Sequence, residues 1–268
     1  MKNDSTSLSL GIQKFFQPHL FFPSDRRIRD LVISHLKGTR VLDAGCGNGW
    51  LSVCAWEKGF SVYSLDIGEN ETRKSSFLFR SKNAYIESTR ASLLGLPFVN
   101  SFFHSIMCIS VLEHLPDVEQ AILEMNRVLK KDGRLIIVVP NGLTFGLIYD
   151  KFIYSLVPTE TILSNVFKTT FSLEKHDISM LNLHKTKPIG HCHQFTLAGI
   201  RNLLIEHGFK IVTIINCRFL SPYLRSFCAL LGMGPIIAFE RIDNRMAEYA
   251  PSNLAAEWVI VCEKFSND

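Results

Sequence analysis

The chain of 268 residues is 47% apolar, which is enough to bury one sizeable core, and we expect a single domain over residues 1–268. The formal net charge is +4, but Lys and Arg are scattered, which does not indicate nucleic-acid binding and is equally compatible with an anionic small substrate or peripheral membrane contact. The first residues lack the apolar stretch of a signal peptide, and no apolar run is long and unbroken enough to span a bilayer, so we expect a cytoplasmic protein.

Apolar segments of strand length alternate with amphipathic segments of helix length along the chain. An N-terminal helical segment over 1–38 ends at Gly38, and Thr196 is placed to cap a later helix. Because parallel strands need crossover connections, the alternation predicts an α/β fold with a mostly parallel, doubly wound sheet and helices on both faces. In chain order, the predicted elements are helix 26–36, strand 40–44, helix 50–58, strand 60–67, helix 71–81, strand 104–110, helix 117–131, strand 133–140, helix 196–208, strand 209–215 and strand 257–265.

Two segments interrupt this alternation. Residues 143–190 and 216–256 are too long for ordinary connections, and both follow the C-terminal ends of strands, where open α/β sheets bind ligands. We therefore expect these insertions to form a lid and the walls of a substrate site. The aromatic residues of the first insertion would either close over an apolar or aromatic ligand or form a small core of their own.

The seven cysteines are odd in number and show no CxxC spacing. Several fall in apolar runs, where a thiol serves as a small hydrophobic side chain, so we expect reduced, buried thiols. They stand at positions 46, 54, 108, 192, 217, 228 and 262.

The glycine cluster in RVLDAGCGNGW, residues 40–50, predicts a ligand site at the end of a buried strand. Glycines between a strand and a helix N-terminus let a ligand approach backbone N–H groups. The dinucleotide pattern requires a glycine where Trp50 stands, and the P-loop pattern requires Gly-Lys-Ser/Thr, which is absent. Both nucleotide interpretations are weakened, and an oxidoreductase using a nicotinamide is disfavoured.

Three ordered blocks of the sequence resemble the class I S-adenosylmethionine-dependent methyltransferases. VLDAGCGNGW followed by Asp66 is similar to the first two motifs of that family. The stretch from LPFVNSFF to VVPN resembles its middle block, and GHCHQFTLAGIRNLLIEHGF resembles the block before its sixth strand, so that the blocks cover 41–141 and 190–212. The resemblance implies a Rossmann-like, seven-stranded sheet, S-adenosyl-L-methionine as cofactor and methyl transfer to a small-molecule acceptor.

The resemblance also implies which residues hold the cofactor. The glycine turn would contact the methionyl part, Asp43 the ammonium group, and Asp66 the two ribose hydroxyls. Asp43 could instead only order the turn, and Asp66 could be a solvated carboxylate at a strand end. Where the family often has an acidic residue for adenine, this chain has Ser92, so the Ser92 hydroxyl or the Leu93 backbone would take that contact. The predicted cofactor-binding residues are Asp43, Gly45, Cys46, Gly47, Gly49, Asp66, Ile67, Ser92, Leu93 and Ile109.

Three histidines are candidate catalytic residues, because a hydroxyl acceptor must lose its proton and histidine titrates near neutral pH. His114 would border the pocket or pack where the next helix begins. His191 and His193 would face the same way in an extended chain. They could serve as base and helper, as substrate contacts, as local structural residues or as half of a metal site. His191 matches a histidine of the family block and is the first choice. No metal is predicted, because further ligands such as His184 or Cys192 could be added only by assumption.

The sequence predicts O-methylation of a natural-product, quinone or lipid-like hydroxyl. The alternatives are N- or C-methylation and a non-catalytic scaffold that binds S-adenosylmethionine. A nucleic-acid methyltransferase is disfavoured, because the chain has no basic arm and ISVLEH stands where an acceptor clamp of the NPPY type would follow the fourth strand.

Overall fold

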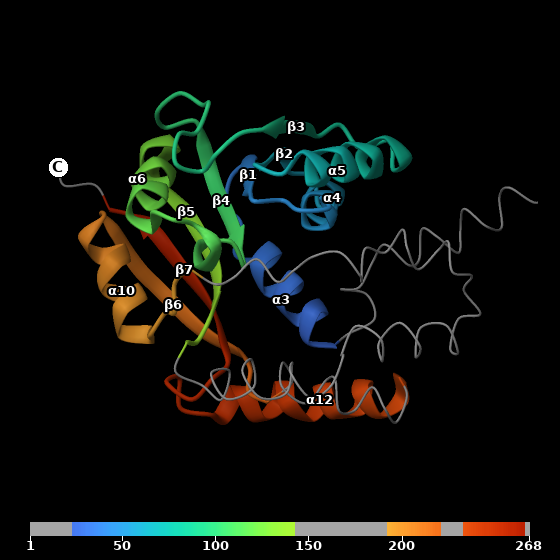
Figure 1. Cartoon of the computed structure of the whole chain (residues 1–268), viewed down its shortest axis with the longest axis vertical. Coiled ribbons are helices and arrows are strands. Elements are labelled where there is room, and N and C mark those ends of the chain that lie inside the picture. The colour runs from blue at the N-terminus through green and yellow to red at the C-terminus, as the bar shows by residue number, and fades with distance from the viewer. Residues whose placement is uncertain (1–22, 143–191, 221–232, 266–268) are drawn as a thin grey trace, which may run out of the picture.

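The computed structural model describes residues 23–142, 192–220 and 233–265, so the first predicted insertion, 143–190, lies outside the described residues. Its centre is a seven-stranded sheet in the order β3-β2-β1-β4-β5-β7-β6, in which only β7 is antiparallel to its neighbours (Figure 1). The predicted doubly wound, mostly parallel sheet is confirmed. The strands are β1 (Arg40–Ala44), β2 (Ser61–Asp66), β3 (Glu87–Arg90), β4 (Phe103–Ile109), β5 (Leu129–Pro140), β6 (Phe209–Arg218) and β7 (Glu257–Lys264).

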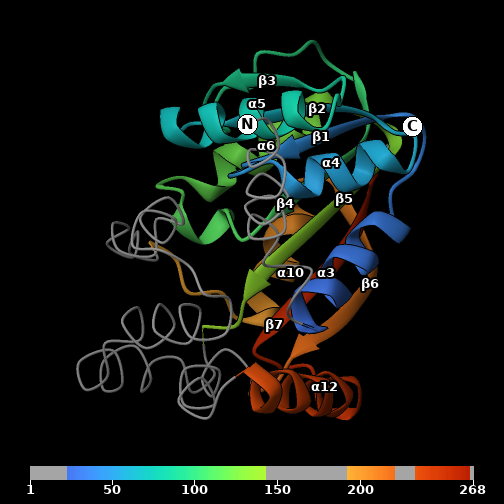
Figure 2. The same ribbon diagram turned by 90° about the vertical axis from the view of Figure 1, so that its right-hand side faces the viewer.

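Helices cover both faces of the sheet, as predicted (Figure 2). Successive side chains of a strand point to opposite faces, so Leu42 of β1 packs into the core that α6 and α10 complete, whereas Val41 packs into the core that α3 and α4 complete. The helix α5 lies against β2 and β3, and α12 lies against α3 and β6. The helical elements are α3 (Pro23–Ser34), α4 (Trp50–Glu57), α5 (Glu69–Ser81), the short 3-10 helix η1 (Leu112–His114), α6 (Val118–Val128), α10 (Leu197–Glu206) and α12 (Met233–Tyr249).

Several elements differ from the sequence-based prediction, and α6 and β3 show why. The helix predicted over 117–131 ends at Val128, because Leu129 is extended and pairs with Phe103 of β4 as the first residue of β5. The strand β3 was not predicted, since its four residues ESTR are polar and edge the sheet without an apolar alternation. Both differences follow from pairing across the sheet, which local sequence patterns do not record.

The helix α12, which lies within the second predicted insertion, is fixed to α3 and to the end of β6 by buried carboxylates. Glu240 Oε2 accepts hydrogen bonds from the N–H and the hydroxyl of Ser24, at 3.2 and 2.8 Å. Asp243 accepts the N–H groups of Phe219 and Leu220, at 3.1 and 2.5 Å. These bonds hold α3 and α12 together beside the edge where β6 ends.

Two further expectations concern thiols and membranes. The six cysteines in the described part of the chain are free thiols. The prediction of buried thiols is confirmed for four of them, whereas Cys54 is half-buried and Cys192 is exposed. Within the same residues, no helix combines the length and the apolar character that crossing a bilayer requires.

Thr196→Ala is predicted to lower the free energy of unfolding by about 1 kcal/mol. Thr196 Oγ1 accepts the N–H of Gly199 at 3.0 Å and caps α10, as the sequence predicts, and α10 packs on β6. Equilibrium denaturation measures the loss, and Thr196→Asp is the matched control because it keeps an acceptor oxygen at the cap. An equal loss in both variants would argue against capping as the cause.

Candidate functional site

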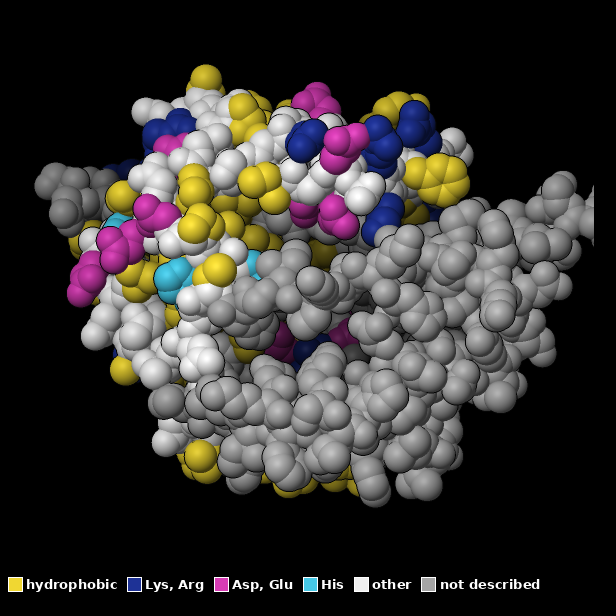
Figure 3. Space-filling model, in the orientation of Figure 1, with side chains coloured by type: hydrophobic (Ala, Val, Ile, Leu, Met, Phe, Trp, Pro, Cys, Tyr) yellow, Lys and Arg dark blue, Asp and Glu magenta, His cyan; other side chains and the backbone are white. Residues whose placement is uncertain are grey.

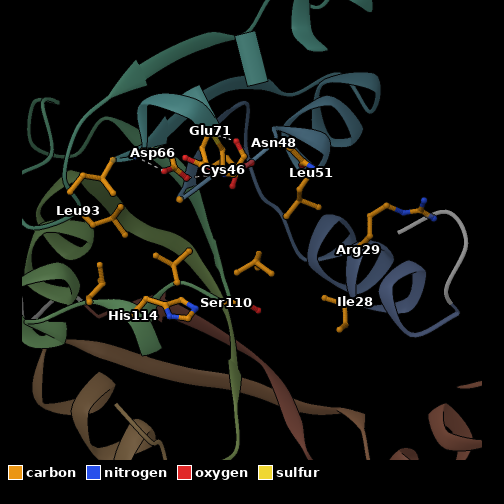
Figure 4. A pocket seen from close by; sticks show the side chains of 18 of the residues that line it. Ile28, Arg29, Cys46, Asn48, Leu51, Asp66, Glu71, Leu93, Ser110 and His114 are labelled. Atoms are coloured by element: carbon orange, nitrogen blue, oxygen red, sulfur yellow. Dashed lines mark hydrogen bonds between the residues drawn. The ribbon is translucent and has the colours of Figure 1, made fainter. Parts of the chain in front are cut away.

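A cavity of about 730 Å³ lies at the edge of the sheet where the parallel strands end. Acidic and basic side chains are visible near the centre of this face of the molecule (Figure 3). The close view shows Asp66 and Glu71 beside the turn after β1, His114 across the cavity, and Ile28 and Arg29 on α3 (Figure 4). The cavity therefore joins the predicted ligand turn to residues from distant parts of the chain.

Three glycines shape the turn between β1 and α4. Gly45, Gly47 and Gly49 have φ angles of +84°, +53° and +83°, in the left-handed region that favours glycine. A Cβ on Gly45 would lie 2.4 Å from the Val111 side chain, and one on Gly49 would lie 2.6 Å from the Phe79 ring. A Cβ on Gly47 would meet nothing within 4 Å. Gly45 and Gly49 are thus required by close packing, whereas Gly47 leaves open space beside bare backbone.

Asp66, the last residue of β2, is held in place by backbone N–H groups. Its Oδ2 accepts the N–H of Gly47 at 2.9 Å, and its Oδ1 accepts the N–H of Gly68 at 2.8 Å. Each carboxylate oxygen can accept more than one hydrogen bond. Asp66 is therefore fixed at the cavity wall and can still accept hydrogen bonds from hydroxyl groups of a ligand.

Asp43 is a carboxyl group buried beneath the glycine turn, with 2% of its surface exposed. Burial raises the pKa of Asp43 to about 7, and the negative charge of Asp66 adds to this, whereas a 2.5 Å hydrogen bond donated by the Ser52 hydroxyl acts in the opposite direction. Burial also raises the pKa of the neighbouring Cys46 thiol to about 12, so that this thiol stays protonated. A positive group bound near Asp43 would favour its ionised form.

Nine of the ten predicted cofactor-binding residues line the cavity, and Gly49 is the exception because it packs against α5. Ile67 is 66% exposed and Leu93 is buried, and both line the cavity together with Ser92. The Ser92 hydroxyl oxygen accepts the N–H of Leu94 at 3.1 Å and retains its own hydrogen for a further bond.

The structure separates the predicted histidines. His114, in η1, lines the cavity, and its Nε2 lies 4.0 Å from Oε1 of Glu113. His193 is not among the residues that line the cavity, and its ring stacks on Phe195 with 6.2 Å between the ring centroids. His191 lies outside the described residues.

The far end of the cavity carries an ion-paired group that the sequence analysis missed. Arg218, at the end of β6, lies 3.1 Å from Glu257 at the start of β7 and also pairs with Asp25 of α3. Burial disfavours the charge of Arg218, but Glu257, Asp25 and Glu240 outweigh it and raise the pKa of the guanidinium. Asp25 and Arg218 are 193 positions apart, so no local pattern could have paired them.

Glu71 was also missed by the sequence analysis, although an acidic first turn of α5 beside Asp66 is a signal for it.

A family model described as a methyltransferase domain matches residues 16–214. The chain belongs to this methyltransferase family. The match confirms the expected resemblance to class I enzymes with S-adenosylmethionine as the family's cofactor, and it sets the nicotinamide alternative aside.

Individual relatives of this methyltransferase are distant. A ubiquinone biosynthesis O-methyltransferase from Rickettsia akari (strain Hartford) is 28% identical over 131 residues, or 47% of this chain and 52% of that protein. The chain spans about half the length of the curated relatives it matches. Among solved structures, the cyclase SpnF has a TM-score of 0.58 at 16% identity over 91% of this chain and 82% of that one. A geranyl diphosphate C-methyltransferase from Streptomyces coelicolor A3(2) has a TM-score of 0.57 at 13% identity over 90% and 78%. At these identities, the two structures show a shared fold.

The cavity of this methyltransferase fits the chemical groups of S-adenosylmethionine. The space beside Gly47 admits a ligand against backbone, and Asp66 offers acceptor oxygens suited to a ribose diol. The buried carboxyl of Asp43 suits an ammonium group. In the described part of the chain, no three His, Cys, Asp or Glu side chains cluster in a way that could hold a metal ion.

Asp43→Asn is predicted to flatten the dependence of stability on pH. Because the pKa of Asp43 is raised from 3.8 to about 7, the folded protein holds a proton between these pH values that the unfolded chain has released. The free energy of unfolding therefore falls as pH rises through this window, by about 4 kcal/mol at most, and the Asn variant lacks this contribution.

Denaturant unfolding of the cofactor-free protein across this pH range measures the effect. Asp132→Asn is the matched control, because Asp132 is an exposed carboxyl in a left-handed turn that asparagine also adopts. Parallel stability curves for the wild type and Asp43→Asn would show that the Asp43 carboxyl is ionised in the fold at these pH values.

Proposed function

We propose that the protein transfers a methyl group from S-adenosylmethionine to a hydroxyl of a small apolar or aromatic molecule, of natural-product, quinone or lipid-like type. The observation that carries this proposal is one cavity that joins the glycine turn and Asp66 to His114 and to the ion-paired Arg218. We take residues 1–268 as one methyltransferase domain, with the segments 143–190 and 216–256 contributing a lid and substrate walls.

In the cofactor half of the cavity, backbone groups and carboxyl side chains are proposed to hold the ligand. The backbone of Gly45 to Gly47 would face the methionyl part, Asp43 the ammonium group, and Asp66 the ribose diol. S-adenosylmethionine, when bound, supplies a methyl group on a positively charged sulfur. The carboxyl groups of this half favour a ligand with positive charge, because its ammonium would offset the cost of ionising buried Asp43.

The adenine side is proposed to lie between exposed Ile67 and the turn that holds Ser92 and Leu93. Ile67 offers apolar surface, and the Ser92 hydroxyl keeps a donor and part of its acceptor capacity beyond its bond to Leu94. Ile109, at the end of β4, lines the cavity beneath this region.

The acceptor half supports a neutral, largely apolar acceptor. Val111, Leu115 and Ile28 line it with apolar surface. The positive charge of Arg218 is already matched by carboxylates, so an anionic acceptor would gain little from it.

Loss of the hydroxyl proton is assigned to His114, because it lines the same cavity as the cofactor residues. His193 is a weaker candidate, since it packs on Phe195 away from the cavity lining. His191 stays a prediction, and it precedes Cys192, whose N–H donates to the backbone of Glu113 at 2.8 Å.

The acceptor proposal is tested with isotope-labelled S-adenosylmethionine and aromatic acceptors that share one ring and differ only in a hydroxyl, an amine or an activated ring carbon. Mass spectrometry is expected to find the label in a methyl ether. Label on nitrogen or carbon alone would contradict O-methylation. Tight binding of S-adenosylhomocysteine with no transfer to any acceptor would favour the non-catalytic scaffold.

Asp66→Ala is predicted to weaken binding of S-adenosylhomocysteine by about 100-fold or more, since two hydrogen bonds to a charged group, each contributing about 1.5–3 kcal/mol, are lost. Isothermal titration calorimetry measures the affinity, and circular dichroism checks the fold. Glu69→Ala is the matched control, because Glu69 is a nearby exposed carboxylate paired with Arg73 outside the cavity lining. Unchanged affinity in Asp66→Ala would remove the ribose assignment.

A further inference from the structure

The helix α12 has its polar and apolar sides reversed relative to an ordinary surface helix. Its inward side carries Glu240 and Asp243, which are fully buried and hydrogen-bonded to α3 and to the end of β6. A surface helix of a globular protein usually turns apolar residues inward and charged residues toward solvent. The inward side of α12 is therefore attached through hydrogen bonds, and large apolar residues remain on its outward side.

An apolar stripe, here called the α12 stripe, is formed by Ile242, Met246 and Tyr249 on the outward side of the helix. These side chains are 58%, 42% and 87% exposed. At about 100° per residue, the three positions lie within about 60° of one another around the helix axis, and exposed Pro235 and Ala238 fall on the same side. Single exposed apolar side chains are normal, whereas a contiguous stripe marks an interaction surface.

Basic side chains flank the α12 stripe. Arg241 and Arg245 are exposed, and in the described part of the chain neither is paired with a carboxylate. Glu248, the exposed carboxylate of α12, is already paired with Arg27 of α3 at 3.3 Å. The unmatched charge beside the stripe is therefore positive.

A groove of about 570 Å³ between α3 and α12 extends this basic surface. It is lined by Arg26, Arg27, Asp30, Leu31, Ser34 and Arg241. Its acidic residue, Asp30, pairs with Arg29 of the same helix at 2.7 Å. Arginines of α3 thus lie beside the basic flank of α12, and the apolar stripe and the arginines together form one surface.

We propose that α12 docks the protein on the surface of an anionic lipid bilayer. The α12 stripe would enter the boundary between headgroups and acyl chains, with the Tyr249 hydroxyl at the level of the headgroups. Arg241 and Arg245 would meet lipid phosphates, since an anionic surface attracts basic residues beside an apolar helix face. One partner then satisfies both the apolar and the basic features of this surface.

A second copy of the chain fits this surface less well. A two-fold dimer uses the same patch of both copies, so pairing two α12 stripes would place Arg241 and Arg245 of both copies in one interface. Like charges brought together in an interface oppose association. The charge on the flank of the stripe therefore favours an anionic bilayer.

Docking through α12 would bring the far end of the cavity close to the bilayer. Glu240, on the inward side of α12, is near enough to Arg218 at that end to interact with it electrostatically. A helix with its side chains is about 10 Å across, so the bilayer surface would lie about one helix diameter from this end of the cavity. Binding to the bilayer does not require methyl transfer, so the inference is tested independently of the proposed function.

Cosedimentation of the full chain with lipid vesicles tests the charge. The protein is expected to bind vesicles of phosphatidylcholine mixed with phosphatidylglycerol, to bind phosphatidylcholine alone more weakly, and to dissociate as salt is added. Arg241→Gln combined with Arg245→Gln is expected to weaken binding to the anionic vesicles about 25-fold, about fivefold for each charge removed. Arg80→Gln combined with Arg201→Gln is the matched control, because it removes the same charge from exposed positions on α5 and α10.

Ile242→Gln combined with Met246→Gln tests the α12 stripe, because glutamine keeps the helix propensity and removes apolar surface. Binding to the anionic vesicles is expected to fall about tenfold or more. Phe77→Gln is the matched control and should leave binding unchanged, because Phe77 is 67% exposed on α5, at the opposite end of the molecule from α12 (Figure 1). Circular dichroism checks the fold of each variant.

A wild-type protein that does not bind the anionic vesicles would overturn the proposal, as would binding that both α12 variants leave unchanged. A wild-type dimer in analytical ultracentrifugation that Ile242→Gln with Met246→Gln dissociates would assign the stripe to a second copy and also overturn it. Hydrogen exchange of the wild type gives a second reading if the variants do not fold. The backbone amides of α12 should gain protection when anionic vesicles are added, and unchanged exchange there would refute docking through α12.

Discussion

The site depends on one connection between the ends of two neighbouring strands. The N–H of Gly47, in the turn after β1, donates to Asp66 at the end of β2, and the N–H groups of Gly45 and Cys46 donate to the carbonyl oxygen of Leu65 at 2.8 and 2.9 Å. These bonds bend the chain sharply after β1 and hold the turn against β2, which only glycines with positive φ allow here. The result is bare backbone and a fixed carboxylate on one wall of the cavity.

The parts of the fold that sequence reasoning predicted are those encoded locally. Apolar β1, the glycines after it and the acidic end of β2 lie within one short stretch, and their positions agree with the structure. The Thr196 cap is equally local. By contrast, the group formed by Asp25, Arg218 and Glu257 joins α3, β6 and β7. Such pairings appear only once the strands meet at one edge.

The cavity has two electrostatically different halves. Near the glycine turn, the cavity is lined by the carboxyl groups of Asp43, Asp66 and Glu71, of which Glu71 pairs with Lys74 at 3.6 Å, and a positively charged ligand would favour the ionised form of Asp43. At the far end, Arg218 is matched by carboxylates, so that the charges there are already balanced. Since one fold serves proteins with unrelated reactions, we expect the charge balance at the far end, more than the turn, to govern which molecules this chain accepts.

The two buried carboxyl groups with raised pKa values, Asp43 and Glu113, differ in whether a ligand in the cavity can reach them. Asp43 lines the cavity beside the turn, so a bound ammonium would reach it and favour its ionised form. Glu113 does not line the cavity, so the same ligand leaves it buried and beside Glu257. A ligand bound in the cofactor half would then change the ionisation of Asp43 but not that of Glu113.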